Sequence, residues 1–488
     1  MRVSLLLALL LVGSLTATAQ TLGRTDFPTS GSPTAQPAFL RGLLQLHSFE
    51  YEDARTAFQE ARQLDPGFAM AAWGEAMTHN HPIWHEQDST AARAALAGVT
   101  RDGLTPRETA YLSTLDVLYG AGSKEARDDA YALAMERLAA TYPDDDDAQA
   151  FYALALLGTS HDGRDVATYM RAAAVAEEVF ARNPQHPGAT HYLIHAYDDP
   201  VHAPLGLRAA RVYADLAPDA AHALHMPTHI LFATGDWPAS VALNERSFNA
   251  AAAASARRGD VLDGHGWHAL YWWTYAELQR GRYDEARRLL AVARERQALD
   301  RSPRARSHLV LIRAFVADAT GDAAVLDIGP PAPRSASVAA RDLLARGRSL
   351  PAHAAVWLDS LEARGGGGAS VEATRAQLAA LAGRPDAMEA LAQAAERDRT
   401  DPFMFGPPGV LVPPGEAYGD ALLASGDAAA AAAAYRDALT RAPGRLALLV
   451  GLARATGDAV DADAVRNALR DADPSVRREV LRSLVSVR

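Results

Sequence analysis

Two pairs of histidines carry the strongest chemical signal in this sequence of 488 residues. His191 and His195 stand four residues apart, and His225 and His229 repeat that spacing one 34-residue interval later. Residues i and i+4 of a helix lie one turn apart on the same face, and helical histidine pairs with this spacing hold metal ions. The four imidazoles are therefore predicted to bind a divalent metal ion together.

Further histidines extend this prediction. Fourteen of the sixteen histidines lie between residues 47 and 268, so they are concentrated in one half of the chain. His222 and His268 share the second position of two units counted from residues 221 and 267, and His79 and His81 belong to an H-x-H-x3-H string. These four are predicted as additional metal ligands. The string is the weaker signal, because Pro82 interrupts any helix between its members.

The available ligand types restrict the metal. The chain has no cysteine, which excludes thiolate sites and disulfides and leaves nitrogen and oxygen ligands. Four imidazoles suit zinc or copper(II), and two imidazoles with a carboxylate would suit iron(II), which is the less favoured choice. Ordinary imidazoles must be neutral to bind, so binding should weaken as the pH falls through about 6.5. The sequence does not say whether the chain is an enzyme. Carboxylates that could assist are Glu75, Asp198, Asp199 and Asp263.

Helical repeats must position these side chains. Alanine-rich stretches with a 3.6-residue period dominate, and strand patterns are scarce. Counted from residue 35, the small residues Gly42 and Ala54 fall at positions 8 and 20, Phe58 at position 24 and Pro66 at position 32. This is the tetratricopeptide pattern, in which small residues let two helices approach and the aromatic residue fills the gap between units.

The pattern recurs along the chain. Counted from residue 412, Gly419, Ala431 and Tyr435 occupy the same positions as in the first unit. In units counted from residues 187 and 221, the two histidine pairs both fall at positions 5 and 9. These positions of the first helix face the concave groove of such arrays, and successive units stack. An all-α tetratricopeptide solenoid is predicted, with the four imidazoles in one patch of its groove.

Four segments are predicted. Residues 1–19 resemble a cleavable signal peptide, with Arg2, an apolar run and Ala17-Thr18-Ala19 before a cut at Gln20, so the protein is expected to be periplasmic or secreted. Residues 20–34 should be flexible. Residues 35–300 form the histidine-rich array, and residues 301–488 form a C-terminal helical array. The acidic run 144–147 is predicted to be a solvated helix start.

Composition and motifs exclude several functions. The net charge is −11 and no basic run is interleaved with aromatic residues, so no nucleic-acid partner is expected. No segment after the first twenty residues is apolar for long enough to insert into a membrane. Phosphate-loop, nucleophile-elbow and H-E-x-x-H motifs do not occur. The alternative to metal binding is a metal-free scaffold that binds a peptide or protein in the concave groove.

Four phrases of the sequence resemble a group of exported bacterial tetratricopeptide repeat proteins with histidine-rich helices. They are Ala76-Met77-Thr78-His79-Asn80-His81-Pro82-Ile83-Trp84, His186 to His195, Pro218 to Ile230, and Phe405-Gly406-Pro407-Pro408 with the segment from Arg445 to Ala453. The resemblance covers most of the chain after the first twenty residues. It implies an all-α solenoid, and it implies no agreed activity.

Overall fold

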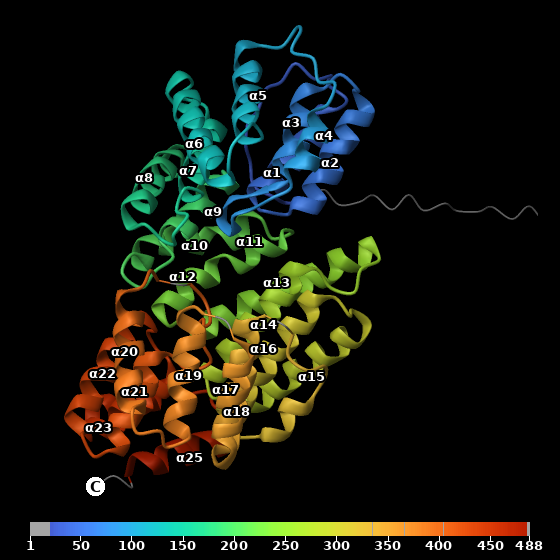
Figure 1. The fold of residues 1–488 in the computed structure, drawn as a ribbon. Coiled ribbons are helices and arrows are strands. Elements are labelled where there is room, and N and C mark those ends of the chain that lie inside the picture. The colour runs from blue at the N-terminus through green and yellow to red at the C-terminus, as the bar shows by residue number, and fades with distance from the viewer. Residues whose placement is uncertain (1–19, 334, 366, 404, 486–488) are drawn as a thin grey trace, which may run out of the picture.

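The structure, a computed structural model, describes residues 20–333, 335–365, 367–403 and 405–485. Within these ranges the chain consists of α-helices joined by short turns, together with three 3₁₀ turns and one two-stranded antiparallel hairpin (Figure 1). The predicted signal peptide lies outside the described residues. No helix of the described part is long and apolar enough to cross a membrane.

The first half of the chain ends at the helix that carries His229. Its elements are α1 Gln36–His47, α2 Tyr51–Leu64, α3 Ala69–Met77, β1 Asn80–His81, η1 Pro82–Trp84, β2 Glu86–Gln87, α4 Ser89–Leu96, α5 Pro106–Leu118, α6 Lys124–Thr141, α7 Asp146–Leu157, α8 Val166–Arg182, α9 Pro187–Ala196, α10 Ala203–Leu216, α11 Ala221–His225 and α12 Pro227–Thr234.

The second half continues as antiparallel helices. Its elements are α13 Trp237–Arg258, α14 Gly264–Gln279, α15 Tyr283–Leu299, α16 Pro303–Thr320, η2 Ala323–Asp327, α17 Ala336–Ser349, η3 Pro351–His353, α18 Ala354–Arg364, α19 Ala369–Leu381, α20 Ala387–Thr400, α21 Pro414–Ala424, α22 Ala428–Arg441, α23 Leu446–Thr456, α24 Ala459–Ala468 and α25 Pro474–Val485.

Packing between hairpins follows the predicted tetratricopeptide rule. The Phe58 ring is fully buried between α1 and α3, where a β-carbon at Gly42 would lie 2.9 Å from it and one at Gly74 would lie 2.3 Å from it. Tyr435 packs against Gly419 and Gly451 in the same way, with corresponding distances of 2.6 Å and 2.5 Å. Glycine at both contacts lets the aromatic ring fill the space between units, so the predicted solenoid is confirmed.

Residues 20–34 are held against the helices, although the sequence predicted a flexible segment. Leu22 and Phe27 are buried in the first core, and the Thr25 hydroxyl donates a 2.7 Å hydrogen bond to Asp147 on α7. The Ser30 backbone donates to Glu108 on α5. Burial of these two apolar side chains, together with the paired polar groups, outweighs the flexibility expected from a polar sequence.

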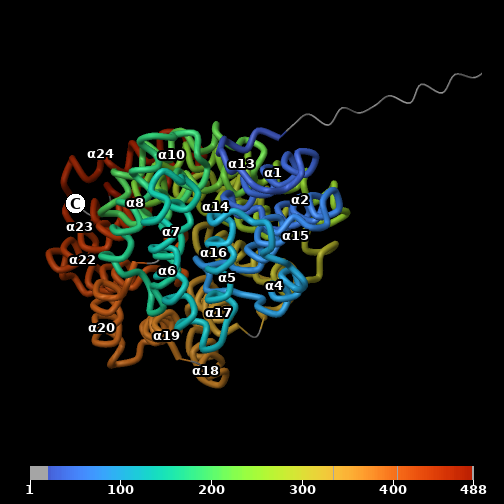
Figure 2. The backbone as a smooth tube through the Cα atoms, turned by 90° about the horizontal axis from the view of Figure 1, so that it is seen from above, coloured from blue at the N-terminus to red at the C-terminus, as the bar shows by residue number. Residues whose placement is uncertain are grey.

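The C-terminal helices fold back against the middle of the chain (Figures 1 and 2). The Trp237 indole on α13 donates a 2.9 Å hydrogen bond to the Gly444 carbonyl, and Arg445 donates to the Tyr275 hydroxyl on α14. Buried apolar side chains form one large cluster that ends at Ala233 and a second that begins at Phe232. The change of core therefore falls at α12, whereas the sequence analysis divided the array near residue 300.

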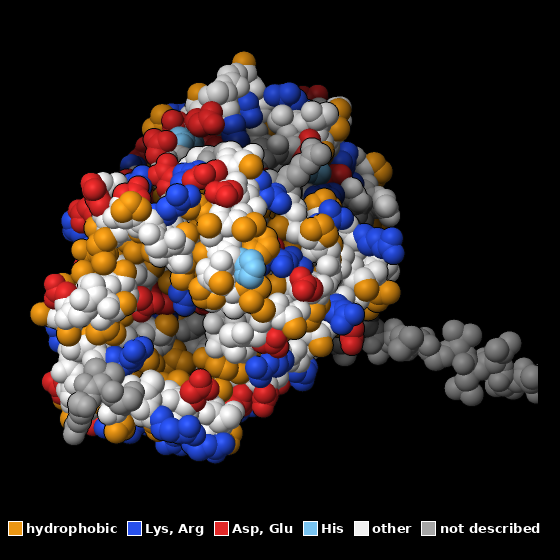
Figure 3. Space-filling view, turned by 60° about the horizontal axis from the view of Figure 1, so that its bottom comes forward, with side chains coloured by type: hydrophobic (Ala, Val, Ile, Leu, Met, Phe, Trp, Pro, Cys, Tyr) orange, Lys and Arg blue, Asp and Glu red, His pale blue; other side chains and the backbone are white. Residues whose placement is uncertain are grey.

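The face drawn in Figure 3 carries charges of both signs. Arginine side chains and acidic side chains are interspersed there, and hydrophobic side chains gather in small patches between them (Figure 3).

Replacement of the inter-unit aromatic residue should destabilise the array. Phe58→Ala removes a fully buried ring between two glycines that cannot fill the space, so we expect a loss of about 3–5 kcal/mol in the free energy of unfolding. Urea unfolding followed by circular dichroism measures it. Leu64→Ala, at a side chain 51% exposed at the end of the same helix, is the control and should change stability by less than about 0.5 kcal/mol. Equal midpoints for Phe58→Ala and wild type would contradict this packing.

Candidate metal centre

Three helices, α9, α11 and α12, bring the paired histidines into one region of the molecule. Helix α9 carries His191 and His195, and α11 and α12 carry His222, His225 and His229. Pro227 separates α11 from α12, but Met226 between them keeps helical dihedral angles, so the i, i+4 register of the second pair is preserved. These five imidazoles are between 0% and 4% exposed. They are buried inside the molecule, whereas the sequence analysis placed them on an open groove.

His191, His195 and His222 form the first trio. Each offers a ring nitrogen within 4.8 Å of those of the other two. His191 donates its Nδ1 proton to the His47 carbonyl at 2.7 Å, so its Nε2 carries a lone pair. The Nε2 atoms of all three rings are buried without a hydrogen-bond partner. A buried polar atom without a partner costs about 1–3 kcal/mol, and here three of them share one place.

The first trio is held in its neutral form. Burial lowers the pKa of His191 to about 3, against the hydrogen bond to the His47 carbonyl, which raises it. Burial, reinforced by the neighbouring imidazoles, also takes the pKa of His195 and of His222 well below the usual range. Neutral imidazoles are the form that coordinates a metal ion.

His225, His229 and His268 form the second trio, again with ring nitrogens within 4.8 Å of one another. The Nδ1 of His225 lies 2.7 Å from the side-chain amide oxygen of Asn244. The amide nitrogen of the same side chain donates to the Ser240 carbonyl, which fixes the orientation of the amide. The Nδ1 of His229 lies 2.5 Å from a carboxylate oxygen of Asp198. Both Nδ1 atoms therefore donate, and both Nε2 atoms carry lone pairs.

Those two lone pairs face each other. The Nε2 atoms of His225 and His229 are 3.1 Å apart while both Nδ1 atoms donate to oxygen, so the two nitrogens need a cation between them, either a shared proton or a metal ion. Two nitrogen ligands on a tetrahedral zinc ion, with bonds of about 2.0 Å, lie about 3.3 Å apart. A histidine that binds a metal ion through one nitrogen usually donates its other ring N–H to a carboxylate or carbonyl oxygen, as the Nδ1 of His229 does here. Burial lowers the pKa of His225 and of His268 well below the usual range.

The structure divides the two predicted pairs between two trios. Each pair, at positions 5 and 9 of one unit, is joined by the histidine at position 2 of the next unit: His222 joins the first pair and His268 the second. The trios are neighbours, because the His195 and His229 rings have centroids 5.9 Å apart. The sequence contains this regularity, since His222 is at position 2 of the unit counted from residue 221 and His268 is at position 2 of the unit counted from residue 267.

His79 and His81 do not join either trio. The His81 ring stacks on Tyr51 with centroids 4.0 Å apart, and its Nε2 donates to the Thr78 carbonyl. His79 lies in the turn before β1 and is half-buried. The string that contains them forms the β1–η1–β2 hairpin and not a helix, so its spacing does not set a common face.

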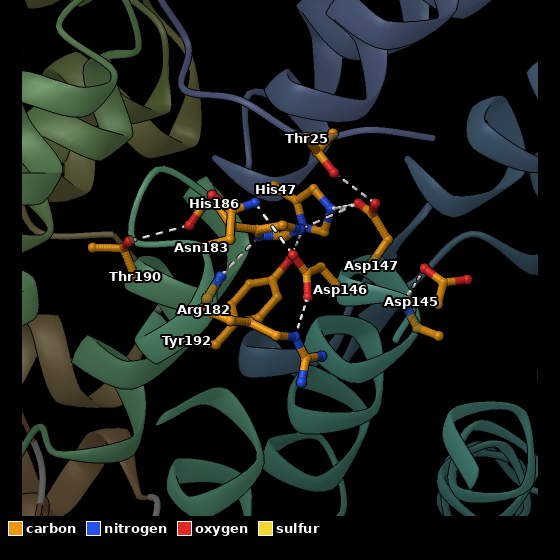
Figure 4. Close-up of polar contacts among 12 residues, drawn as sticks. Thr25, His47, Asp145, Asp146, Asp147, Arg182, Asn183, His186, Thr190 and Tyr192 are labelled. Carbon is orange, nitrogen blue, oxygen red and sulfur yellow. Dashed lines mark hydrogen bonds and ion pairs between the residues drawn. The ribbon is translucent and has the colours of Figure 1, made fainter. Parts of the chain in front are cut away.

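A buried triad that the sequence analysis missed supports the first trio. His47, Asp147 and His186 point toward one another (Figure 4), with His47 Nε2 2.8 Å from the Asp147 carboxylate. The Tyr192 hydroxyl donates to the other His47 nitrogen at 3.0 Å. The triad holds His47 in place. The backbone carbonyl of His47 accepts the Nδ1 proton of His191, and this leaves the lone pair of His191 on its Nε2.

Asp147 was predicted to be solvated and is fully buried. Burial alone would raise the pKa of its carboxyl group, but the imidazole of His186, 3.4 Å away, and the hydrogen bond from His47 hold that pKa well below the usual range. The acidic run marked a helix start correctly, since α7 begins at Asp146 and Asp145 caps it. Asp147, the fourth residue of the run, faces inward because α7 packs against α9.

Aromatic side chains cover both trios. The Phe49 ring lies 4.3 Å from His191 and 5.5 Å from His222, and the backbone of Phe49 has a left-handed φ of 55°. Such a conformation is uncommon for a bulky residue and is found at functional sites. At the second trio, Trp272 and Phe405 pack on His229 with centroids 4.5 Å and 5.2 Å away.

The fold and the glycine–aromatic packing between units define a tetratricopeptide-type helical solenoid with buried histidine clusters. No protein-family model and no curated protein matches the chain. Solved structures similar to it include the human IFIT1 dimer with m7Gppp-AAAA, at 14% identity, 96% coverage of this chain, 91% of that chain and a TM-score of 0.36. Another is the P58(IPK) TPR domain, at 12% identity, 87% coverage of this chain, 98% of that chain and a TM-score of 0.20. A third is yeast Tom70, at 10% identity, 93% coverage of this chain, 88% of that chain and a TM-score of 0.29. None of these likenesses bears on what this chain binds.

Acid should destabilise the protein when metal is withheld. Burial lowers the pKa of His47 to about 4 and of His191 to about 3, so between about pH 6.5 and 4 the unfolded chain binds more protons at these groups than the folded chain. Their contribution to stability is present above about pH 6.5 and is lost as the pH falls, by up to about 1.4 kcal/mol per pH unit for each group.

Urea unfolding at several pH values in the presence of a chelator measures this loss. His191→Gln should give a shallower dependence on pH than wild type, whereas His353→Ala, at an exposed site, should leave the dependence unchanged. A free energy of unfolding that does not change between about pH 7 and 5 would contradict the burial of neutral imidazoles.

Proposed function

We propose that this helical-repeat protein binds divalent metal ions through its two histidine trios, one ion at His225, His229 and His268 and one at His191, His195 and His222. The observation that carries the proposal is the pair of Nε2 atoms of His225 and His229, which face each other at 3.1 Å while both Nδ1 atoms donate to oxygen. A cation between them resolves the repulsion of the lone pairs. The three unpartnered Nε2 atoms of the first trio support a second ion.

Zinc or copper(II) fits these ligands better than iron(II). Each trio supplies three nitrogen ligands, and the Asp198 carboxylate beside the second trio is engaged by the Nδ1 of His229. Three protein ligands leave a coordination position for water or another ligand, which is the arrangement of catalytic zinc sites and not of closed structural ones. Export, proposed from residues 1–19, would load these sites outside the cytoplasm.

The alternative is a metal-free scaffold that holds a peptide or protein along the array. The repeat architecture supports it, since extended helical arrays present large surfaces. The histidines would not take part, because they are buried and cannot contact a peptide on the surface. Metal content therefore separates the two functions.

Elemental analysis of the full-length protein, purified after export and dialysed, tests the proposal. Wild type should carry up to two equivalents of a divalent metal, with one lost in His225→Ala/His229→Ala and the other lost in His191→Ala/His195→Ala. His308→Ala is the control, because that half-buried histidine belongs to neither trio, and it should keep both equivalents. Unchanged metal in both double variants, with wild-type circular dichroism, would refute the proposal.

Metal affinity should depend little on mild acid. Three ordinary imidazoles with a pKa of about 6.5 would lose on the order of a thousandfold in affinity at a pH one unit below that value. Burial lowers the pKa of His191 to about 3 and takes those of His195 and His222 well below 6.5, so the folded site remains neutral there. Competition against a coloured chelator at about pH 7.5 and 5.5 should show less than a tenfold change. A fall near a thousandfold, in protein that is still folded, would show that the ligands are exposed histidines.

A further inference from the structure

A cavity lies where the C-terminal helices close against the second trio. It has a cavity volume of about 180 Å³ and opens to solvent. Its inner end is formed by Asp198 and His229, one wall by α12–α14, and the opposite wall by α19, α20, α22 and the segment 401–414. Its position between two packed parts of a chain is a common one for small-molecule sites.

The inner end of the cavity holds a carboxylate oxygen with no partner. Asp198 is 1% exposed, and its Oδ2 accepts the His229 proton while its Oδ1 has no hydrogen-bond partner. A buried ionised oxygen of this kind requires a donor, and a positively charged donor satisfies it best. Asp198 therefore offers the cavity one specific polar contact.

The wall beside this carboxylate is aromatic. Phe232, Trp237 and Tyr275 line it, and the polar atoms of the last two are already used: the indole donates to Gly444 and the phenol accepts from Arg445. The ring faces are left for an apolar body, and they also attract a cation held over them.

The charges around the cavity favour a cation. Three carboxylates line it, those of Asp198, Asp398 and Asp401. Two arginines also line it, but Arg397 is paired with Glu372, and Arg441 lies 3.9 Å from Asp398 and donates to the Asp401 carbonyl. The arginines are therefore committed to acids on the protein, whereas Asp198 is free to bind a ligand.

We infer that this cavity binds an organic amine, with its ammonium group at the free oxygen of Asp198 and its apolar body against Phe232, Trp237 and Tyr275. The inference goes beyond metal binding and does not depend on it, because the ammonium uses Oδ1 of Asp198, whereas His229 is bound to Oδ2. An aromatic amine of the size of 2-phenylethylamine supplies both parts.

Isothermal titration calorimetry on the full-length protein, as purified and again after chelation, tests this inference with matched probes. 2-Phenylethylamine should bind at least about tenfold more tightly than 2-phenylethanol, which has the same body and no charge, and phenylacetate should not bind. Binding should quench the fluorescence of Trp237 in the cavity wall. Because the chelated protein is measured as well, the affinity for the amine can be determined even if the protein binds no metal ion.

Two variants test the placement. Asp198→Asn keeps an acceptor for His229 and removes the charge, so the affinity for 2-phenylethylamine should fall at least about tenfold. Ser370→Trp fills the cavity from the opposite wall without touching Asp198, and it should abolish binding. Asp215→Asn, a surface carboxylate 83% exposed, changes the net charge equally and should bind as wild type does.

Three outcomes would overturn the inference. The first is an absence of measurable binding to folded wild-type protein. The second is equal affinity for the amine and the alcohol, which would make Asp198 irrelevant to recognition. The third is wild-type affinity in both Asp198→Asn and Ser370→Trp, which would place the amine elsewhere on the protein.

Discussion

Burial favours the neutral form of an imidazole, and both nitrogens of a neutral ring need partners: an acceptor for the one that carries hydrogen and a donor or a cation for the other. Five histidines of the two trios lie almost fully inside the protein, so this requirement determines much of what surrounds them. The acceptors are provided by the chain: the His47 carbonyl for His191, Asn244 for His225 and Asp198 for His229. The remaining lone pairs converge, and that convergence makes a metal site the most economical explanation.

The repeat supplies the second level of organisation. Each trio takes positions 5 and 9 of one unit and position 2 of the next, so each proposed ion would join two neighbouring units of an array that depends on nearest-neighbour contacts. One arrangement used twice gives two neighbouring sites with similar ligands. Their surroundings differ, since the first trio is closed by Phe49 and the second adjoins the cavity.

The C-terminal half completes the second site although it contributes no ligand. Its segment between α20 and α21 lays Phe405 on His229 and brings Gly406 against Trp272, where a β-carbon would lie 2.3 Å from the indole. This contact gives a physical reason for glycine in the phrase Phe405-Gly406-Pro407-Pro408. The fold-back also builds the outer wall of the cavity, so the proposed metal site and the proposed amine site both adjoin contacts between the two halves.

The sequence by itself determined the features that local periodicity encodes. Alanine-rich helices, the Gly42–Phe58 contact and the i, i+4 spacing of each histidine pair all depend on residues close together in the chain, and the 34-residue repeat carries them from unit to unit. Only the tertiary structure decided how the pairs divide into two trios, because that depends on how successive units stack. It also decided that Asp147 is buried and that Asp198 meets His229, since both follow from packing between separate helices. The cavity was the feature that the sequence predicted least. Its walls come from residues some 200 positions apart, and these meet only when the C-terminal helices fold back.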